Sequence, residues 1–159
     1  IFNAMIEAKK VGTLISFDFS DPFLANIKKG EIQNIIDNFA DIIFANEEEA
    51  KLFTGKNAAD AMKILSKKIK YVAIKLGKKG SLVSFNGKVE KIPVYKVTAL
   101  DTTGAGDLFA AGFLFGISKG KPLKTCGNIA SFMAGKVVAQ YGAYFDYDIG
   151  KELRKYITE

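Results

Sequence analysis

Two kinds of hydrophobic pattern, one typical of strands and one of helices, alternate along the first half of the chain. Short apolar runs predict strands at residues 13–19, 41–45 and 71–75. The second run is apolar almost throughout, which is typical of a strand buried on both faces of a parallel sheet. Between these runs, apolar residues recur at helical spacing over residues 23–38, 46–53 and 57–69. The alternation of strands and helices predicts an α/β fold with a mostly parallel sheet.

The second half begins with a different pattern. Residues 81–92 alternate around Asn86-Gly87, a strong signal for a tight β-hairpin, and residues 94–98 predict one more strand. The uncharged run at 108–117 predicts a helix buried on most of its surface. Two amphipathic helices follow at 123–141 and 148–157.

The first ten residues already show helical spacing and lack an initiator methionine. We therefore expect residues 1–159 to be the C-terminal part of one longer domain, with an N-terminal portion absent.

The amino-acid composition limits which catalytic sites, metal sites and disulfides these residues can form. The 159 residues are 48% hydrophobic and 25% charged, enough for one compact core. No histidine is present, which excludes histidine triads and most zinc sites within these residues. Cys126 is the single cysteine, so no internal disulfide can form; we expect a buried structural thiol and a cytoplasmic protein.

Charge and hydropathy also weigh against two kinds of partner. The net charge of +6 is spread over single lysines and short pairs, which favours small anionic ligands over nucleic acid. No apolar run is long enough to cross a membrane. We expect neither nucleic acid nor a membrane as a partner.

The most informative stretch is residues 101–107, Asp-Thr-Thr-Gly-Ala-Gly-Asp, directly before the uncharged helix. A helix that begins at glycines exposes backbone N–H groups at the positive end of its dipole, which is an anion site. The stretch lacks the third glycine of a dinucleotide-binding loop, since Phe109 stands there, and it lacks the Gly-Lys-Ser/Thr of a Walker A loop. A plain reading is a helix start capped by Thr102 or Thr103.

Residues 101–107 and the following Leu-Phe-Ala-Ala-Gly-Phe resemble the second signature of the PfkB/ribokinase family of carbohydrate and nucleoside kinases. Residues 17–22, 44–50 and 140–143 are most similar to its adenosine-kinase-like subgroup. The resemblance implies a ribokinase-like three-layer α/β sandwich, of which this chain covers about the C-terminal half. The family's first signature, its lid and most sugar contacts lie outside that half.

The resemblance implies a role for each matching position of the signature. Asp107 is the general base that takes the proton of the acceptor hydroxyl, and Gly104, Ala105 and Gly106 supply N–H groups to the transferring phosphoryl group. Such stabilisation suits phosphoryl transfer, whose loose transition state depends on charge and positioning.

Asn46 and Glu49 match the family's Asn-x-x-Glu element, which the resemblance links to Mg²⁺ and phosphate through water. Oxygen ligands and retained waters suit Mg²⁺. Taken alone, the acids could simply complement the dipole of a helix start. Glu47 and Glu48, between the two, are expected to face solvent.

Lys75, Gly77 and Gly80 match the family's turn near the ATP phosphates, although many members carry a small residue where Lys75 stands. Lys78 or Lys79 could meet a phosphate or face solvent.

Further positions match at the edge of the site. Asp101 and Thr103 match positions that help to hold a monovalent cation such as K⁺ in some relatives, with Thr103 also near the nucleotide. Asn128 lies on the helix that borders the adenine in relatives, and Asp18 matches a position on the substrate side.

These expectations describe a cytoplasmic phosphotransferase. It would use ATP and Mg²⁺ to phosphorylate a hydroxymethyl group of a nucleoside, with adenosine first, or of a simple sugar. A homodimer through the absent lid is a further expectation. The alternative is a nucleotide-binding regulatory or structural module without catalysis, because a fold alone does not settle function. A dinucleotide-dependent oxidoreductase is disfavoured by the missing third glycine.

Overall fold

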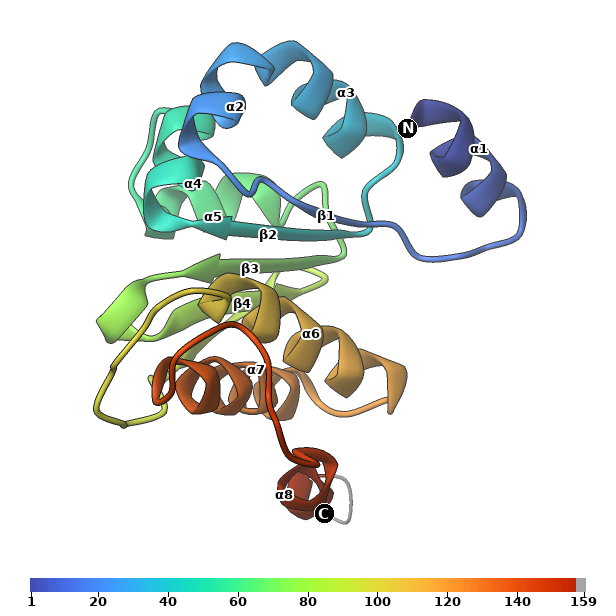
Figure 1. Cartoon of the computed structure of the whole chain (residues 1–159). Helices are drawn as coiled ribbons and strands as arrows, with labels where there is room; N and C mark the ends of the chain where they lie inside the picture. Colours follow the sequence, from blue (N-terminus) through green and yellow to red (C-terminus); the bar gives the residue numbers. More distant parts are fainter. Residues whose placement is uncertain (157–159) are drawn as a thin grey trace. The chain divides into compact units, whose positions relative to one another are not determined.

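The computed structural model describes residues 1–156, except for the side chains of Leu24 and Ala25. It divides into two units, each described here by itself: Ile1–Leu76 with Leu82–Val89, and Gly77–Ser81 with the chain from Glu90 onward. Figure 1 follows the element order, which is α1 (Phe2–Lys10), β1 (Ser16–Asp18), α2 (Pro22–Ile27), α3 (Lys29–Asn38), β2 (Ile42–Asn46), α4 (Glu47–Thr54), α5 (Ala58–Leu65), β3 (Tyr71–Lys75), the 3₁₀ turn η1 (Gly77–Lys79), β4 (Ser81–Phe85), β5 (Lys88–Ile92), α6 (Ala105–Ser118), α7 (Leu123–Val138), α8 (Gly150–Leu153) and the 3₁₀ turn η2 (Arg154–Tyr156).

Among the described residues, the strands form one five-stranded sheet in the order β1-β2-β3-β4-β5. The first three strands are parallel, with Asp18 opposite Phe44 and Asn46 opposite Lys75. The predicted parallel start is therefore confirmed. Because parallel strands end at the same edge, this register places the ends of β1, β2 and β3 side by side.

The core of the first unit covers one face of this parallel part. Ile43 and Ala45 of β2 and Val72 and Ile74 of β3 pack in one buried cluster with residues of α3, α4 and α5. Alternate residues on the opposite face of β2, such as Ile42 and Phe44, are also buried. Burial on both faces explains why this strand reads as a continuous apolar run.

The expected hairpin is present. Asn86 and Gly87 join β4 to β5 with φ angles of 47° and 81°, the left-handed conformation that a two-residue hairpin turn requires.

Two predicted elements differ in the structure. The helix expected at 23–38 is divided at Lys28 into α2 and α3. The strand expected at 94–98 is wrong: among the described residues this segment joins no strand ladder, and the Tyr95 N–H donates to the hydroxyl of Ser131 at 2.8 Å. The Ser131 hydroxyl therefore accepts the hydrogen bond that a neighbouring strand would have accepted.

Several helices end earlier than the sequence pattern suggested, with α5 ending at Leu65 and α7 at Val138. The closing helix begins at Gly150 and continues as η2, while residue 157 of its expected range lies outside the described part. No helix in residues 1–156 has the length and apolar content needed to span a membrane.

Candidate active site

The first turn of α6 carries unused backbone donors. Its N-cap is Gly104, with φ 76° and no side-chain hydrogen bond to the turn, so neither Thr102 nor Thr103 caps the helix. The Ala105 N–H donates to the Thr102 carbonyl at 3.2 Å, and the first helical bond runs from the Leu108 N–H to the Gly104 carbonyl at 2.9 Å. Of the expected donors, the Ala105 N–H is thus already engaged, whereas within residues 1–156 no partner is assigned to the N–H groups of Gly104 and Gly106. The Asp107 N–H, which sequence analysis did not name, is also without an assigned partner there, at the positive end of the dipole.

Asp107 stands beside these donors. Its side chain is exposed on the first turn of α6, and within residues 1–156 the structure assigns it no hydrogen bond or ion pair. A carboxylate without a structural contact at an anion-binding helix start is available for proton transfer.

The position of this helix start depends on Asp101. Its carboxylate accepts hydrogen bonds from the Thr103 N–H at 2.9 Å, the Thr103 hydroxyl at 2.7 Å and the Gly142 N–H at 3.1 Å. These bonds hold the pKa of Asp101 below its ordinary value, the Thr103 backbone bond most strongly. A Cβ on Gly104 would lie 2.6 Å from that of Ala143, so glycine is needed here for space as well as for φ.

A seam of small residues fixes α6 against α7. A Cβ on Gly112 would meet the Ala130 Cα at 2.9 Å, and one on Gly116 would meet the Cys126 Cα at 2.8 Å. The expectation of a helix buried on most of its surface needs correction. Only the stripe Phe109, Gly112, Phe113 and Gly116 is buried among the described residues of α6, because this stripe faces the seam.

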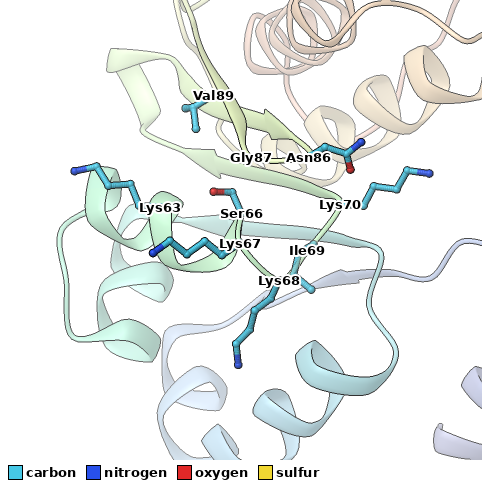
Figure 2. A pocket seen from close by; sticks show the side chains of 9 residues that line it. All are labelled: Lys63, Ser66, Lys67, Lys68, Ile69, Lys70, Asn86, Gly87 and Val89. Carbon is cyan, nitrogen blue, oxygen red and sulfur yellow. The ribbon is translucent and has the colours of Figure 1, made fainter.

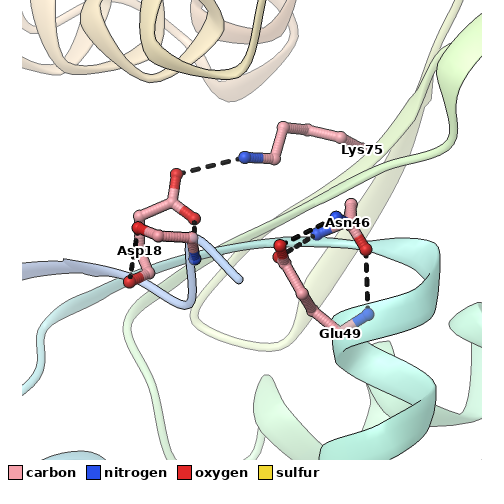
Figure 3. Close-up of polar contacts among 5 residues, drawn as sticks. Asp18, Asn46, Glu49 and Lys75 are labelled. Atoms are coloured by element: carbon pink, nitrogen blue, oxygen red, sulfur yellow. Dashed lines mark hydrogen bonds and ion pairs between the residues drawn. The ribbon is translucent and has the colours of Figure 1, made fainter. Parts of the chain in front are cut away.

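Asn46 and Glu49 form a capping box at the start of α4. The Asn46 N–H and side-chain amide donate to the two Glu49 carboxylate oxygens at 2.7 and 2.8 Å, and the Glu49 N–H donates to Asn46 Oδ1 at 2.8 Å (Figure 3). Burial raises the pKa of Glu49, while the bond from Asn46 and the charge of Lys75 oppose this rise. The pair therefore has a local structural role that neither alternative named, while Glu47 and Glu48 are exposed as expected.

The pair also fits a magnesium site of the outer-sphere type. One buried carboxylate and one amide oxygen retain lone pairs for metal-bound water, which Mg²⁺ keeps readily. Within the described part of the chain, no group of three His, Cys, Asp or Glu side chains gathers to hold a metal directly.

Lys75 lies on the neighbouring strand end. Its ammonium forms an ion pair with Asp18 at 3.1 Å, and both side chains are largely buried (Figure 3). Sequence analysis considered the two residues separately and missed this contact, because 57 positions separate them.

The turn after β3 has the geometry that its glycines predict. Gly77 has φ 56° and Gly80 has φ 91°, and a Cβ on Gly80 would collide with the Ile92 carbonyl. Lys78 and Lys79 are exposed.

Asn128 is half-buried on α7. The neighbouring residue is Gly127, and the Ile92 side chain occupies the space that a Cβ on this glycine would need. Cys126 is buried as expected, and burial raises the pKa of its thiol to about 11.

The structure therefore collects the expected residues in two groups. Asp18, Asn46, Glu49 and Lys75 lie at the strand ends of the first unit. The second unit holds the remaining candidates, which are Gly77, Gly80, Asp101, Thr103, Gly104, Ala105, Gly106, Asp107 and Asn128.

A basic hollow of about 670 Å³ lies elsewhere on the first unit (Figure 2). Its lining includes Ser66, Asn86 and four lysines, which are Lys63, Lys67, Lys68 and Lys70. The last turn of α5 ends here, and lysines at a helix C-terminus complement its dipole. Lys63 and Lys68 are also engaged with Asp60 and Asp37. This hollow contains none of the expected site residues.

Comparison with known proteins gives the following relatives and similar structures. An uncharacterised sugar kinase from Archaeoglobus fulgidus is 33% identical over 129 residues, covering 81% of this chain and 51% of that protein. The adenosine kinase structure from Sinorhizobium meliloti is 29% identical with a TM-score of 0.91, covering 96% of this chain and 48% of that one. A fructokinase double mutant from Vibrio cholerae, solved with fructose, ADP and a potassium ion, is 25% identical with a TM-score of 0.76, covering 89% and 49%.

These likenesses confirm the expected ribokinase-type α/β fold. The chain spans about half the length of the relatives it matches. The model of the pfkB family of carbohydrate kinases matches residues 1–149, so the chain belongs to that family.

Proposed function

We propose that this chain is the C-terminal part of a kinase domain that transfers the γ-phosphoryl group of ATP to a hydroxymethyl group. The observation that carries the proposal is the start of α6, where an exposed Asp107 stands beside uncapped N–H groups. An intact Asp107 beside intact glycines argues against a nucleotide-binding module without catalysis, because loss of this carboxylate would be the simplest route to such a module.

In the proposed reaction, the Asp107 carboxylate accepts the proton of the acceptor hydroxyl. The hydroxyl oxygen forms a bond to the γ-phosphorus, the bond from that phosphorus to the β–γ bridging oxygen breaks, and ADP leaves. The N–H groups of Gly106 and Asp107 stabilise the charge on the transferring group without rearrangement. Lys75 and the turn from Gly77 to Gly80 would contact the ATP phosphates, and Asn128 would border the adenine.

Asn46 and Glu49 would hold Mg²⁺ through water, and the bound ion would neutralise phosphate charge. For a monovalent cation, Asp101 and Thr103 are the proposed ligands, supported by the potassium ion named for the fructokinase relative.

Adenosine or a related nucleoside is the proposed acceptor, with a simple sugar as the second candidate. The adenosine kinase relative supports the first, and the fructose-bound fructokinase supports the second.

The experiment measures ADP release by the full-length protein with adenosine, ribose and fructose. We expect Asp107→Asn to lower kcat about a hundredfold or more while ATP still binds. Asp60→Asn is the matched control, because Asp60 occupies the same third position of α5 and is exposed. Unchanged turnover in Asp107→Asn contradicts the assigned base, and nucleotide binding without any transfer favours the regulatory module.

A further inference from the structure

The ion pair between Asp18 and Lys75 crosses a strand end. Asp18 pairs with Phe44 in the sheet and Lys75 pairs with Asn46, so the lysine side chain reaches over the end of β2 to Asp18 Oδ2 at 3.1 Å. The two side chains are 24% and 19% exposed. Figure 3 shows the ammonium extended toward Asp18, near the box of Asn46 and Glu49.

Asp18 is itself held in place. Its Oδ1 accepts the Ser20 N–H at 3.1 Å, and the Ser20 hydroxyl donates to the Asp18 carbonyl at 3.2 Å. Ser20 adopts φ 62°, a left-handed conformation that a non-glycine residue rarely takes. The turn thus presents the carboxylate in one orientation to the lysine.

A lysine side chain has many rotamers, and part of this conformational entropy is lost whenever a ligand orders the side chain. An aspartate that has already ordered the side chain removes that cost from ligand binding. The ammonium has three N–H donors, so bonding to Asp18 leaves donors for a second anionic group. Ligands of open α/β sheets bind at the carboxyl ends of the strands, where this pair lies.

We infer that Asp18 is a positioning residue, which holds the Lys75 ammonium in place to meet the phosphates of the bound nucleotide. The inference rests on the proposed function, in which the chain binds ATP. In this role Asp18 acts through Lys75, in place of the substrate-side contact that the family resemblance implies for it.

The sign of the Asp18 effect makes the inference testable. Simple electrostatics says that a carboxylate near phosphates repels them, so its removal should tighten nucleotide binding. The positioning role predicts the opposite, because the freed lysine becomes mobile.

The test measures the dissociation constants of ADP and adenosine with the full-length protein. We expect Asp18→Ala and Lys75→Met each to weaken ADP binding about tenfold and to leave adenosine binding unchanged, since adenosine has no phosphate. The double variant should be no weaker than Lys75→Met alone, because both changes remove one contact. Lys75→Arg should retain most of the affinity, since arginine keeps the charge near Asp18.

Asp18→Asn, which keeps an acceptor for Ser20, should follow Asp18→Ala and guards against a misfolded variant. Asp37→Asn is the matched control, since it breaks the exposed ion pair with Lys68. Tighter ADP binding in Asp18→Ala, additive losses in the double variant, or an equal loss for adenosine overturns the inference while leaving the kinase proposal intact. A wild-type protein that binds no ADP overturns both.

Discussion

Asp101 joins two distant parts of the second unit through one side chain. Its carboxylate binds the Thr103 turn and, 41 positions away, the Gly142 N–H. Thr103 is the residue before Gly104, and Gly142 is the residue before Ala143, which packs directly against Gly104. The start of α6 therefore owes its shape to a residue outside the helix.

Ionised Asp101 should stabilise the fold in a pH-dependent way. Its folded pKa lies below the ordinary value of 3.8, so the stabilisation is complete above that pH and is lost as the pH falls toward the folded pKa. Asp101→Asn should lower the free energy of unfolding at neutral pH, and the gap to the wild type should narrow in acid. Urea unfolding at about pH 6 and about pH 3 measures this gap. A gap that does not change with pH contradicts the assignment to the ionised form.

Single residues also show where sequence reasoning stops. Sequence analysis paired Asn46 with Glu49 only through the family's Asn-x-x-Glu element and did not predict their capping box, although this is a pattern over four neighbouring positions. The contact of Asp18 with Lys75 could not be predicted, because β2 brings the two strand ends together only in the folded sheet.

At the scale of elements, the hairpin that depends on local sequence was predicted correctly, whereas the strand that depends on a tertiary partner was not. The hairpin at Asn86-Gly87 formed because its turn geometry depends on those two residues alone. Residues 94–98 had the composition of a strand but no strand partner. Ser131 of α7 instead accepts the Tyr95 N–H and donates to the Pro93 carbonyl, both at 2.8 Å.

Ser131 should therefore stabilise the second unit. Ser131→Ala leaves the Tyr95 N–H without this acceptor and should lower the free energy of unfolding by about 1 to 3 kcal/mol. Ser118→Ala is the matched control: the Ser118 hydroxyl is exposed and bonds within its own helix, to Phe115. Urea unfolding of the two variants compares them, and equal losses would show that Ser131 is not a tether.

At the scale of the molecule, the family and the fold were predictable from one seven-residue stretch and the order of elements. The acceptor was not. The chain spans about half the length of its relatives, and the resemblance to the family places most sugar contacts in the other half.

The length of the chain leads to a further prediction. Because the relatives are about twice as long, we expect the 159 residues alone to turn over about a hundredfold or more slowly than the full-length protein, for lack of groups that orient the acceptor. ADP release at saturating ATP measures both, with Asp107→Asn of each as background. Equal rates would mean that these residues contain the complete acceptor site.

The seam between α6 and α7 limits how such an enzyme can be redesigned. Gly112 and Gly116 bring backbone against backbone, so no larger side chain fits there without separating the helices. An engineer who wishes to admit a new acceptor would have to leave these positions alone and randomise residues off the seam. The same glycines that hold α6 against α7 make this helix a poor starting point for directed evolution of specificity.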